Sequence, residues 1–392
     1  MKTQDLLRAS CTAVFVLATA SEALAAEGFK LRFPVSGTLG GEIVAPLPSE
    51  GTFGSVVVTD INVSGITGSD GNPLKQTTAV PVVIPDPQAT AVATAALTGT
   101  AYAGAISQVA TILKNGTASV SGTSNIEVQK YHQTIVNITL GHVLSNDVNG
   151  GRLVTVVNIP YAAVFDTSIK ATGSLTPGSA TGVQQVANNV AAGAAADKYK
   201  ASLAAVGESA SVSISGLGDI EASLLWEKSM DALKVVAGAT LVMPTGEYEY
   251  TPGTLKPNIG FGNYYTLRTG LGVAYTASES MTLGARASLG FNSQNMDSYV
   301  RSGDYYGIDL AAAFRTPVGV VGPHITMVRQ YTDDTGSALG ANRLSITGAG
   351  FFYTVPIVAL GKAGLNIAYM KTTDTKNSLV GDFVQARLTK VF

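Results

Sequence analysis

The 392-residue sequence has few charges, no long hydrophobic run and almost no cysteine. Only 13% of its residues are charged, against about 25% in an ordinary soluble protein. The formal net charge of −2 argues against a nucleic-acid-binding protein, which would carry a basic stripe. No uninterrupted apolar run reaches roughly 18 residues, which argues against a helical membrane protein. The hydrophobic share of 46% argues against a disordered chain.

The N-terminus has the features of a secretory signal peptide. Lys2 and Arg8 give a basic start, a short apolar stretch follows, and Ala23-Leu24-Ala25 is a small-x-small cleavage site. We therefore expect a signal peptide over residues 1–25, with cleavage near Ala25. The single cysteine, Cys11, lies inside it, so the mature chain would have no disulfide, thiol nucleophile or cysteine-ligated metal.

Short segments with period-two alternation dominate the chain from Ser209 onward. In the segment 281–292, apolar side chains occupy the odd positions, and Thr, Gly, Arg, Ser and Asn occupy the even ones. Successive side chains of a strand point to opposite faces, so one face suits lipid and the other water. This alternation is the sequence pattern of a transmembrane β-barrel.

Twelve segments carry the strand pattern and are separated by turn residues. They cover residues 53–66, 128–143, 151–163, 211–226, 232–243, 263–276, 280–292, 303–316, 319–331, 341–354, 362–372 and 382–392. An even number of strands lets a barrel close with both chain ends on the periplasmic side. We predict an all-β fold, a closed antiparallel transmembrane β-barrel of about 12 strands. It would occupy residues 51–392, after an irregular N-terminal segment at 26–50.

Two Ala-rich segments do not follow the strand pattern. Residues 88–113 and 183–206 lack alternation and contain good helix formers. We expect one or two helical regions there, within insertions into the barrel at 75–125 and 166–208. Neither segment is apolar enough to span a bilayer. A loosely ordered insertion is the alternative.

An antiparallel β-sandwich would show the same alternation, but two features favour a membrane barrel. The polar faces consist of Gly, Ser, Thr and Ala with an occasional Arg, whereas a soluble sandwich would expose many charges. Aromatic residues gather near segment ends, as at 264–265, 305–306 and 351–353, like the interfacial girdles of outer-membrane barrels. The last strand ends at Phe392, which resembles the terminal signal that the barrel assembly machinery recognises.

Five motifs occur in order along the C-terminal half: GDIE (218–221), MPTGEY (243–248), NIGFGNY (258–264), SYVRSGD (298–304) and RQYTDDTG (329–336). This ordered set resembles the phenol meta-pathway degradation family of outer-membrane proteins, which are transporters encoded with aromatic-degradation functions. The resemblance implies a Gram-negative outer-membrane barrel that passes aromatic or other small hydrophobic molecules. The family-motif positions that we single out are Asp219, Pro244, Gly246, Asn263, Gly303, Asp304, Gln330, Asp334 and Gly336.

Several charged and polar side chains occupy inward positions of the predicted strands. The lumen-lining candidates are Arg268, Arg286, Arg315, Arg343, Arg387, Asp309, Glu221, Tyr305 and His324. Such groups set the electric field that a permeating solute meets. They could form a basic stripe that guides anionic solutes, or an Arg–carboxylate network that stabilises the lumen. We favour the network, because unpaired charge in a narrow space is costly.

No set of residues predicts an enzyme or a cofactor. A hydrolase needs a base near a serine, yet His132, His142 and His324 are the only histidines, and none has a nucleophile and an orienting group beside it. The oxygens of 332–336 could bind a divalent cation, but a solvated turn is the simpler interpretation. Nucleotide-binding and zinc motifs are absent from the sequence, so we expect no catalytic residues, metal or cofactor.

The strand pattern thus predicts an outer-membrane barrel, and the family resemblance implies a channel for passive passage of small hydrophobic or aromatic compounds. Its expected partners are outer-membrane lipid and lipopolysaccharide, the barrel assembly machinery and the solute itself, with no nucleic acid. A general or structural outer-membrane barrel without substrate selectivity is the alternative function.

Overall fold

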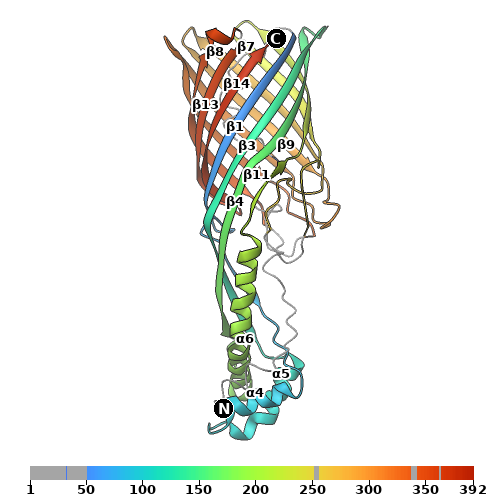
Figure 1. The fold of residues 1–392 in the computed structure, drawn as a ribbon, viewed down its shortest axis with the longest axis vertical. Coiled ribbons are helices and arrows are strands. Elements are labelled where there is room, and N and C mark those ends of the chain that lie inside the picture. Colours follow the sequence, from blue (N-terminus) through green and yellow to red (C-terminus); the bar gives the residue numbers. More distant parts are fainter. Residues whose placement is uncertain (1–31, 33–50, 251–255, 337–341, 362) are drawn as a thin grey trace. The chain divides into compact units, whose positions relative to one another are not determined.

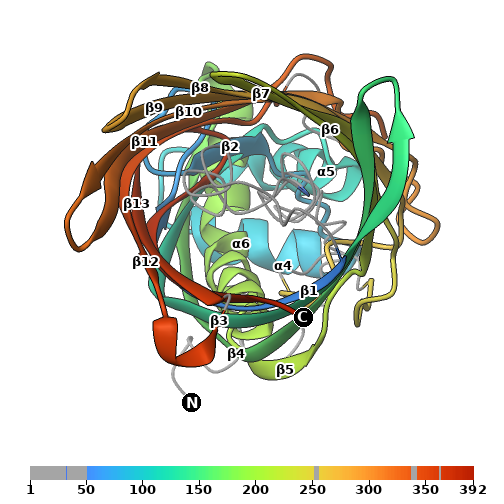
Figure 2. The same cartoon turned by 90° about the horizontal axis from the view of Figure 1, so that it is seen from above.

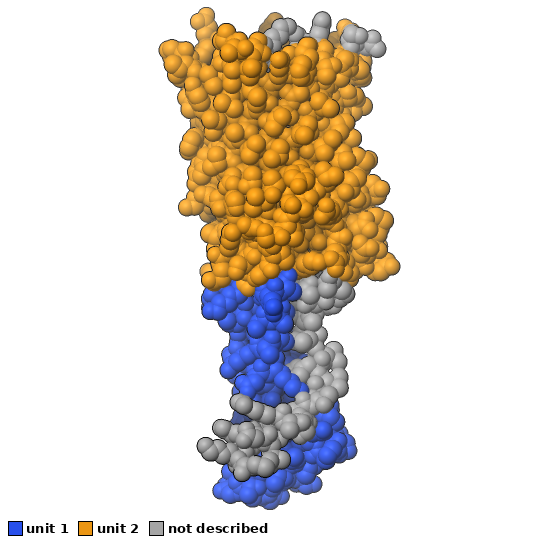
Figure 3. All heavy atoms as spheres, in the orientation of Figure 1, with its two compact units in different colours: residues 1–21, 74–127, 170–209 blue, residues 22–73, 128–169, 210–392 orange. Residues whose placement is uncertain are grey.

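The computed structural model describes residues 32, 51–250, 256–336, 342–361 and 363–392. The predicted signal peptide at 1–25 lies outside the described residues, as does the irregular segment at 26–50 except for Arg32. The described residues divide into two compact units (Figure 3). The barrel unit contains Arg32 and residues 51–73, 128–169 and 210–392, and the insertion unit contains residues 74–127 and 170–209.

Twelve of the strands in the described residues form a closed ring (Figures 1 and 2). In chain order they are β1 (Gly51–Ile66), β3 (Val120–Val148), β4 (Gly151–Pro177), β6 (Glu221–Met230), β7 (Leu233–Val242), β8 (Thr266–Ser278), β9 (Met281–Asn292), β10 (Tyr305–Thr316), β11 (Gly319–Gln330), β12 (Ser345–Pro356), β13 (Ala363–Lys376) and β14 (Leu379–Val391). The ring closes because β1 pairs with both β14 and β3, and β3 pairs with β4. The predicted closed barrel of 12 strands is confirmed.

Two short strands lie outside the ring and change the predicted boundaries. β2 (Lys75–Ala79) pairs with β3, and β5 (Ser213–Leu217) pairs with β4. The single strand predicted at 211–226 is therefore wrong, since β5 and β6 divide that segment. β3 and β4 are also longer than predicted, at 29 and 27 residues. Their additional residues are rich in Ser, Thr and Gly on both faces, so apolar alternation does not mark them.

The two ends of the barrel differ in the length of their connections. At the end that carries the C-terminus, two-residue turns join β6 to β7, β8 to β9 and β10 to β11. Asp231, in the first of these turns, adopts a left-handed φ of 46°. Most connections at the other end are longer, such as 243–265 and 331–344, although only residues 377–378 join β13 to β14 there. Short periplasmic turns and longer extracellular loops are typical of outer-membrane barrels, so the C-terminal end corresponds to the periplasmic side.

The outer face of the barrel carries apolar side chains. Along β9, Leu283, Leu289 and Phe291 are exposed, whereas Gly284 and Ser288 between them are buried. The same alternation occurs on β8, where Leu267 and Leu271 are exposed. An outward apolar belt of this kind is what hydrocarbon requires of a transmembrane barrel. The predicted outward and inward faces of these strands are confirmed.

The aromatic clusters are divided between the two faces of the wall. Tyr265, Tyr306 and Phe351 are exposed, but their neighbours Tyr264, Tyr305 and Phe352 are buried. Adjacent strand residues point to opposite sides, so each cluster contributes only part of its rings to the outer surface. The expected interfacial position therefore applies to Tyr265, Tyr306 and Phe351 and not to their buried neighbours.

The insertion unit contains α4 (Gln88–Leu97), the short 3₁₀ helix η2 (Ala103–Ala105), α5 (Ile106–Asn115) and α6 (Gly182–Ser209). The helix predicted at 183–206 is confirmed, but the segment 88–113 is not one continuous helix. It is interrupted after α4, where Gly99 adopts a φ of +81°. In the described residues, none of the helices is both long enough and apolar enough to cross a membrane.

A small apolar core holds the insertion unit together. Val109 and Leu113 of α5 are fully buried against Ala191 and Ala195 of α6. Asn188 is also fully buried, accepting a hydrogen bond from the Ser119 amide (2.9 Å) and donating one to the Gly178 carbonyl (2.8 Å). Alanine on α6 allows close helix packing, and Asn188 satisfies backbone groups that would otherwise be costly to bury.

Candidate functional site

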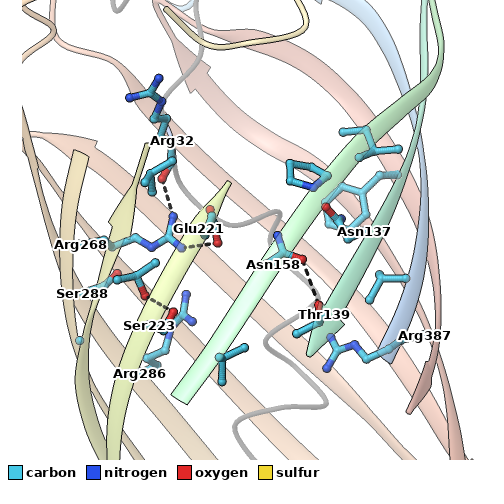
Figure 4. A pocket seen from close by; sticks show the side chains of 18 of the residues that line it. Arg32, Asn137, Thr139, Asn158, Glu221, Ser223, Arg268, Arg286, Ser288 and Arg387 are labelled. Atoms are coloured by element: carbon cyan, nitrogen blue, oxygen red, sulfur yellow. Dashed lines mark hydrogen bonds and ion pairs between the residues drawn. The ribbon is translucent and has the colours of Figure 1, made fainter. Parts of the chain in front are cut away.

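A cavity of about 780 Å³ lies inside the barrel unit (Figure 4). Its lining comes from the inward positions of the strands, together with Arg32. The charged residues among its described lining are Arg32, Lys234, Arg268, Arg286, Arg387, Asp219, Glu221 and Asp382. Five of these are basic and three are acidic, so how they are paired decides whether the lumen attracts anions.

One wall of the cavity, formed by β1, β3 and β4, is mainly apolar. Phe53 and Val57 of β1 and Ile135 of β3 line it. Tyr131 and Phe165 pack beside this wall with their ring centroids 5.3 Å apart. Amides and hydroxyls interrupt it, as where Thr139 donates a hydrogen bond to Asn158 (2.9 Å; Figure 4).

The facing wall, on β6 to β10, carries two ion pairs. Arg268 Nη2 lies 3.0 Å from Glu221 Oε2, and Arg286 Nη2 lies 3.2 Å from Asp309 Oδ2. Asp309 also accepts a hydrogen bond from Thr326 (2.6 Å). These pairings correspond to the expected Arg–carboxylate network: Arg286 of β9 meets its counter-charge on the neighbouring strand β10, and Arg268 of β8 reaches across β7 to Glu221 of β6.

Five of the nine lumen-lining candidates do not line the cavity. Asp309, Tyr305 and His324 point inward but are buried behind its surface. Arg315, near the periplasmic end of β10, and Arg343, before β12 begins, are exposed and lie away from the cavity. Arg315 and Arg343 are therefore not among the residues that line this cavity, although Arg315 keeps the inward parity of β10.

Arg343 instead takes part in a surface ion pair. Its Nε donates to Asp333 Oδ1 at 2.7 Å. This hydrogen bond lowers the pKa of Asp333, and the same pairing raises the pKa of Arg343. An exposed pair of this kind has little effect on stability.

Arg32 and Asp219 form a buried ion pair that sequence reasoning did not find. Arg32 Nη2 lies 2.8 Å from Asp219 Oδ2, and the side chains are only 1% and 5% exposed. Arg32 also donates to the carbonyls of Gly262 and Tyr264. Its own carbonyl accepts hydrogen bonds from Arg268 (2.7 Å) and Tyr305 (2.9 Å). Arg32 lies 187 residues from Asp219 and outside all of the predicted strands, so no periodicity could have marked it.

Three of the five sequence motifs meet at Asp219. Besides the guanidinium of Arg32, its carboxylate accepts hydrogen bonds from the amides of Gly246 (3.0 Å) and Phe261 (3.0 Å). Asp219, Gly246 and Phe261 come from the GDIE, MPTGEY and NIGFGNY motifs. The three motifs therefore hold together the connections around β6, β7 and β8, and we call this set of contacts the Asp219 cluster.

The other two motifs meet at Asp334. Asp334 is buried, and its Oδ1 accepts hydrogen bonds from the Gly303 amide (2.7 Å) and Gln330 Nε2 (2.7 Å). Gln330 Oε1 in turn accepts one from the Leu344 amide (2.6 Å). Asp304 pairs with Arg301 (2.8 Å) in the same loops. We call this set the Asp334 cluster. It shows that 332–336 is not simply a solvated turn.

The remaining motif positions have local roles in the loops. Asn263 donates to Asp297 (3.1 Å). Gly336 adopts a φ of +78°, and a Cβ there would lie 2.9 Å from the Tyr299 carbonyl, so only glycine fits. Pro244 lies two residues beyond Val242, the last residue of β7, where a residue without an amide hydrogen cannot extend the ladder.

The histidines do not form a catalytic arrangement in the described residues. His324 is buried, with Nε2 3.1 Å from the Tyr369 carbonyl, and burial leaves no room for a substrate. His132 contacts Asp60 (2.7 Å) and His142 contacts Thr52 (3.0 Å), both on the outward face of β3. Across the same residues, no group of three or more His, Cys, Asp or Glu side chains could hold a metal ion.

Residues 112–388 match the protein family described as "Putative MetA-pathway of phenol degradation". The match includes all five motifs and both hydrogen-bonded clusters, apart from Arg32. No curated protein matches the chain.

Among solved structures, the chain resembles the COG4313 outer membrane channel from Pseudomonas putida F1. The TM-score is 0.57 at 13% identity, covering 90% of this chain and 98% of the channel. This likeness supports the barrel fold. Weaker similarity extends to a Pseudomonas aeruginosa FadL homologue (TM-score 0.37, 8% identity, 94% and 98% coverage). It also extends to the CymD monoaromatic hydrocarbon channel (TM-score 0.37, 11% identity, 96% and 99% coverage).

Proposed function

Because the chain belongs to the phenol-degradation MetA-pathway family, we propose that it is an outer-membrane channel for small hydrophobic or aromatic compounds. Passage would be passive and driven by the solute gradient. The apolar outer belt places the barrel in the outer membrane, since a β-barrel with this belt is stable in hydrocarbon.

The composition of the lumen is the observation that carries this proposal. One wall presents Phe53, Val57 and Ile135, and the charges on the opposite wall are paired with each other. An apolar solute can therefore cross without displacing a strongly hydrated ion, whereas an anion gains little from guanidinium groups that already have partners. We infer that the lumen charges form an Arg–carboxylate network that stabilises the wall, and that they do not form a basic stripe that guides anionic solutes.

Uptake by whole cells tests the proposal. The protein would be expressed in a Gram-negative host that lacks its major porins, where lipopolysaccharide retards hydrophobic solutes. We expect faster uptake of a radiolabelled aromatic compound and unchanged uptake of a small sugar. Faster uptake of both would favour the alternative, a general barrel without selectivity, and no change for either would favour a structural role.

We also infer that the protein is a channel and not an outer-membrane hydrolase. His324 is the only histidine on the inward face, and its Nε2 already faces a carbonyl. The assay is hydrolysis of ester and lipid substrates by purified protein and by the His324→Ala variant. Turnover that depends on His324 would contradict this inference.

Phe392 is proposed as the contact for the barrel assembly machinery. It follows β14 and is 74% exposed, and its amide donates to the Thr52 carbonyl (2.9 Å). Lys390, which interrupts the apolar outer face, has its ammonium 5.8 Å from the Phe392 ring, a cation–π distance. At the opposite end, the long connections would lie at the level of lipopolysaccharide.

We propose that the Asp219 and Asp334 clusters stabilise the loops at the extracellular end of the lumen. Their carboxylates are occupied by backbone amides and by Arg32 or Gln330, so they hold connections in place and do not bind solute. Of the lumen-lining candidates, Arg268, Arg286, Arg387 and Glu221 remain as residues that a solute would pass.

A further inference from the structure

A stretch of bare backbone faces the lumen on β8. Seven consecutive residues from Arg268 to Ala274 line the cavity. In an ordinary strand only every second residue can do so, because alternate side chains point outward. Leu271 is an outward residue with 52% of its surface exposed on the apolar belt, so its contribution to the cavity comes from its backbone.

Glycine at two inward positions of β8 leaves the backbone of this strand accessible from the cavity. Gly270 and Gly272 lie between the inward residues Arg268 and Ala274, and Gly238 pairs with Gly270 on the neighbouring strand β7. A Cβ on Gly270 would meet no atom closer than 3.5 Å, and one on Gly272 none closer than 3.8 Å. Gly270 and Gly272 are therefore not needed to avoid a collision, whereas a Cβ on Gly238 would lie 2.4 Å from the Leu224 carbonyl oxygen. We call the space above Gly238, Gly270 and Gly272 the glycine hollow.

A hydroxyl without a partner borders the glycine hollow. Ser288 of β9 is the register partner of Gly270, lines the cavity and is only 6% exposed. Its Oγ has no hydrogen-bond partner among the described residues. A buried polar group without a partner is costly, and a serine hydroxyl can both donate and accept. The hydroxyl is thus suited to a ligand that carries its own hydrogen-bonding group.

The charges next to the hollow already have partners. Arg286, the register partner of Gly272, pairs with Asp309, and Arg268 pairs with Glu221. On the other side, the hydroxyls of Ser223 and Thr240 bond to each other at 2.8 Å. In Figure 4, Ser288, Arg286 and Ser223 lie on one side of the cavity, opposite Arg387. An anionic ligand would have to compete with the carboxylates, whereas a neutral one would not.

We propose that the glycine hollow is a binding subsite for a neutral, planar ring that carries one hydrogen-bonding group, such as a hydroxyl. The ring face packs on the peptide planes of β8, where no side chain intervenes, and the substituent bonds to Ser288. This inference rests on the proposed function, since it assigns a place in the lumen to a solute of the class that the channel passes.

The first test uses ¹⁹F NMR titration of the purified mature protein in detergent, with empty detergent micelles as the blank. The probes are 4-fluorophenol, fluorobenzene and 4-fluorobenzoate. We expect 4-fluorophenol to bind about fivefold more tightly than fluorobenzene, as one hydrogen bond allows, and more tightly than the benzoate. Preference for the benzoate would overturn the neutral-ligand assignment.

Substitutions that fill the glycine hollow or remove the Ser288 hydroxyl test whether the ring binds there. The double variant Gly270→Ala/Gly272→Ala fills the hollow at ordinary contact distances, so the barrel should keep its melting temperature while 4-fluorophenol binds about tenfold more weakly. Gly364→Ala is the matched control, because Gly364 also lines the cavity, on β13, and has room for a Cβ. It should leave binding unchanged. Ser288→Ala should weaken 4-fluorophenol about fivefold without affecting fluorobenzene.

Crystals soaked with 4-bromophenol separate the possible failures, because the anomalous signal of bromine locates the ring. We expect a peak over Gly270 and Gly272. A peak elsewhere in the lumen, or equal binding by the double alanine variant, would overturn the subsite and leave the channel proposal intact. Absence of any peak in the lumen, together with unchanged aromatic uptake by cells, would overturn both.

Discussion

Arg32 and Asp219 form a buried ion pair between residues 187 positions apart, with Nη2 and Oδ2 separated by 2.8 Å. Because Asp219 also accepts the amides of Gly246 and Phe261, one carboxylate connects Arg32 to three of the family motifs. Removing either charge should leave the other buried without its counter-charge, which is among the costliest changes that a folded protein can suffer.

We predict that Asp219→Ala lowers the free energy of unfolding by about 3 kcal/mol. Arg32→Ala should also destabilise the barrel, and the double variant should lose clearly less than the sum of the two single losses. The measurement is urea-induced unfolding in detergent, followed by heat-modifiable mobility on a gel. Strictly additive losses would show that the two side chains do not stabilise each other.

Arg286 tests whether the lumen charges stabilise the wall or select ions. Arg286→Ala leaves the buried Asp309 without its cation and should cost about 2 kcal/mol. Single-channel anion/cation selectivity should stay the same, because the pair is nearly neutral. Arg315→Ala is the matched control and should change neither property, since Arg315 is exposed. A clear loss of anion preference in Arg286→Ala would instead support a basic stripe that guides anionic solutes through the lumen.

The adjacent residues Asp333 and Asp334 should respond very differently to substitution. Asp334→Ala leaves the Gly303 amide and Gln330 Nε2 without their acceptor, and we expect a loss of about 2 kcal/mol. Asp333→Ala breaks only an exposed pair with Arg343 and should have no measurable effect. Thermal melting of the two variants is the assay, and equal melting temperatures would contradict a buried role for Asp334.

Much of the barrel could be predicted from the sequence because its strands obey a local rule. On β9, apolar and polar residues alternate without exception, so the face of Leu289 follows from counting by twos. This alternation rule does not predict contacts between distant residues or the ends of helices, because neither follows a regular period in the sequence. The buried contacts of Arg32 and Asn188 join segments far apart in the sequence, and Gly99 interrupts a run of helix formers that otherwise looks continuous.

The site could be predicted only in part for the same reason. Strand parity places Arg268 and Arg286 inward, but it does not identify Glu221 and Asp309 as their partners. Motif resemblance singled out Asp219 and Asp334 without revealing that their carboxylates bind backbone amides. No sequence pattern indicated that the glycine hollow could be a binding subsite, because glycine within a strand usually indicates a bulge or a close contact.

The outer face of β8 can be tested by introducing a charge. Leu271→Arg places a guanidinium on the apolar belt and should cost about 2 to 4 kcal/mol if Leu271 faces hydrocarbon near the bilayer midplane. Val318→Arg, in the turn between β10 and β11, is the control and should be neutral. Folding yield and unfolding free energy in lipid vesicles would be measured. Equal behaviour of the two variants would mean that Leu271 does not contact lipid.

Spin labelling along β9 tests most directly whether the outer face contacts lipid while the inner face encloses water. Cys11 is the only cysteine of the chain, so in a Cys11→Ser background the replacements Ala287→Cys, Ser288→Cys and Leu289→Cys give unique labels. In lipid vesicles we predict that labels at 287 and 289 collide mainly with oxygen, which concentrates in hydrocarbon, and that the label at 288 does not. Equal collision with a water-soluble nickel reagent at all three positions would contradict a lipid-facing outer surface.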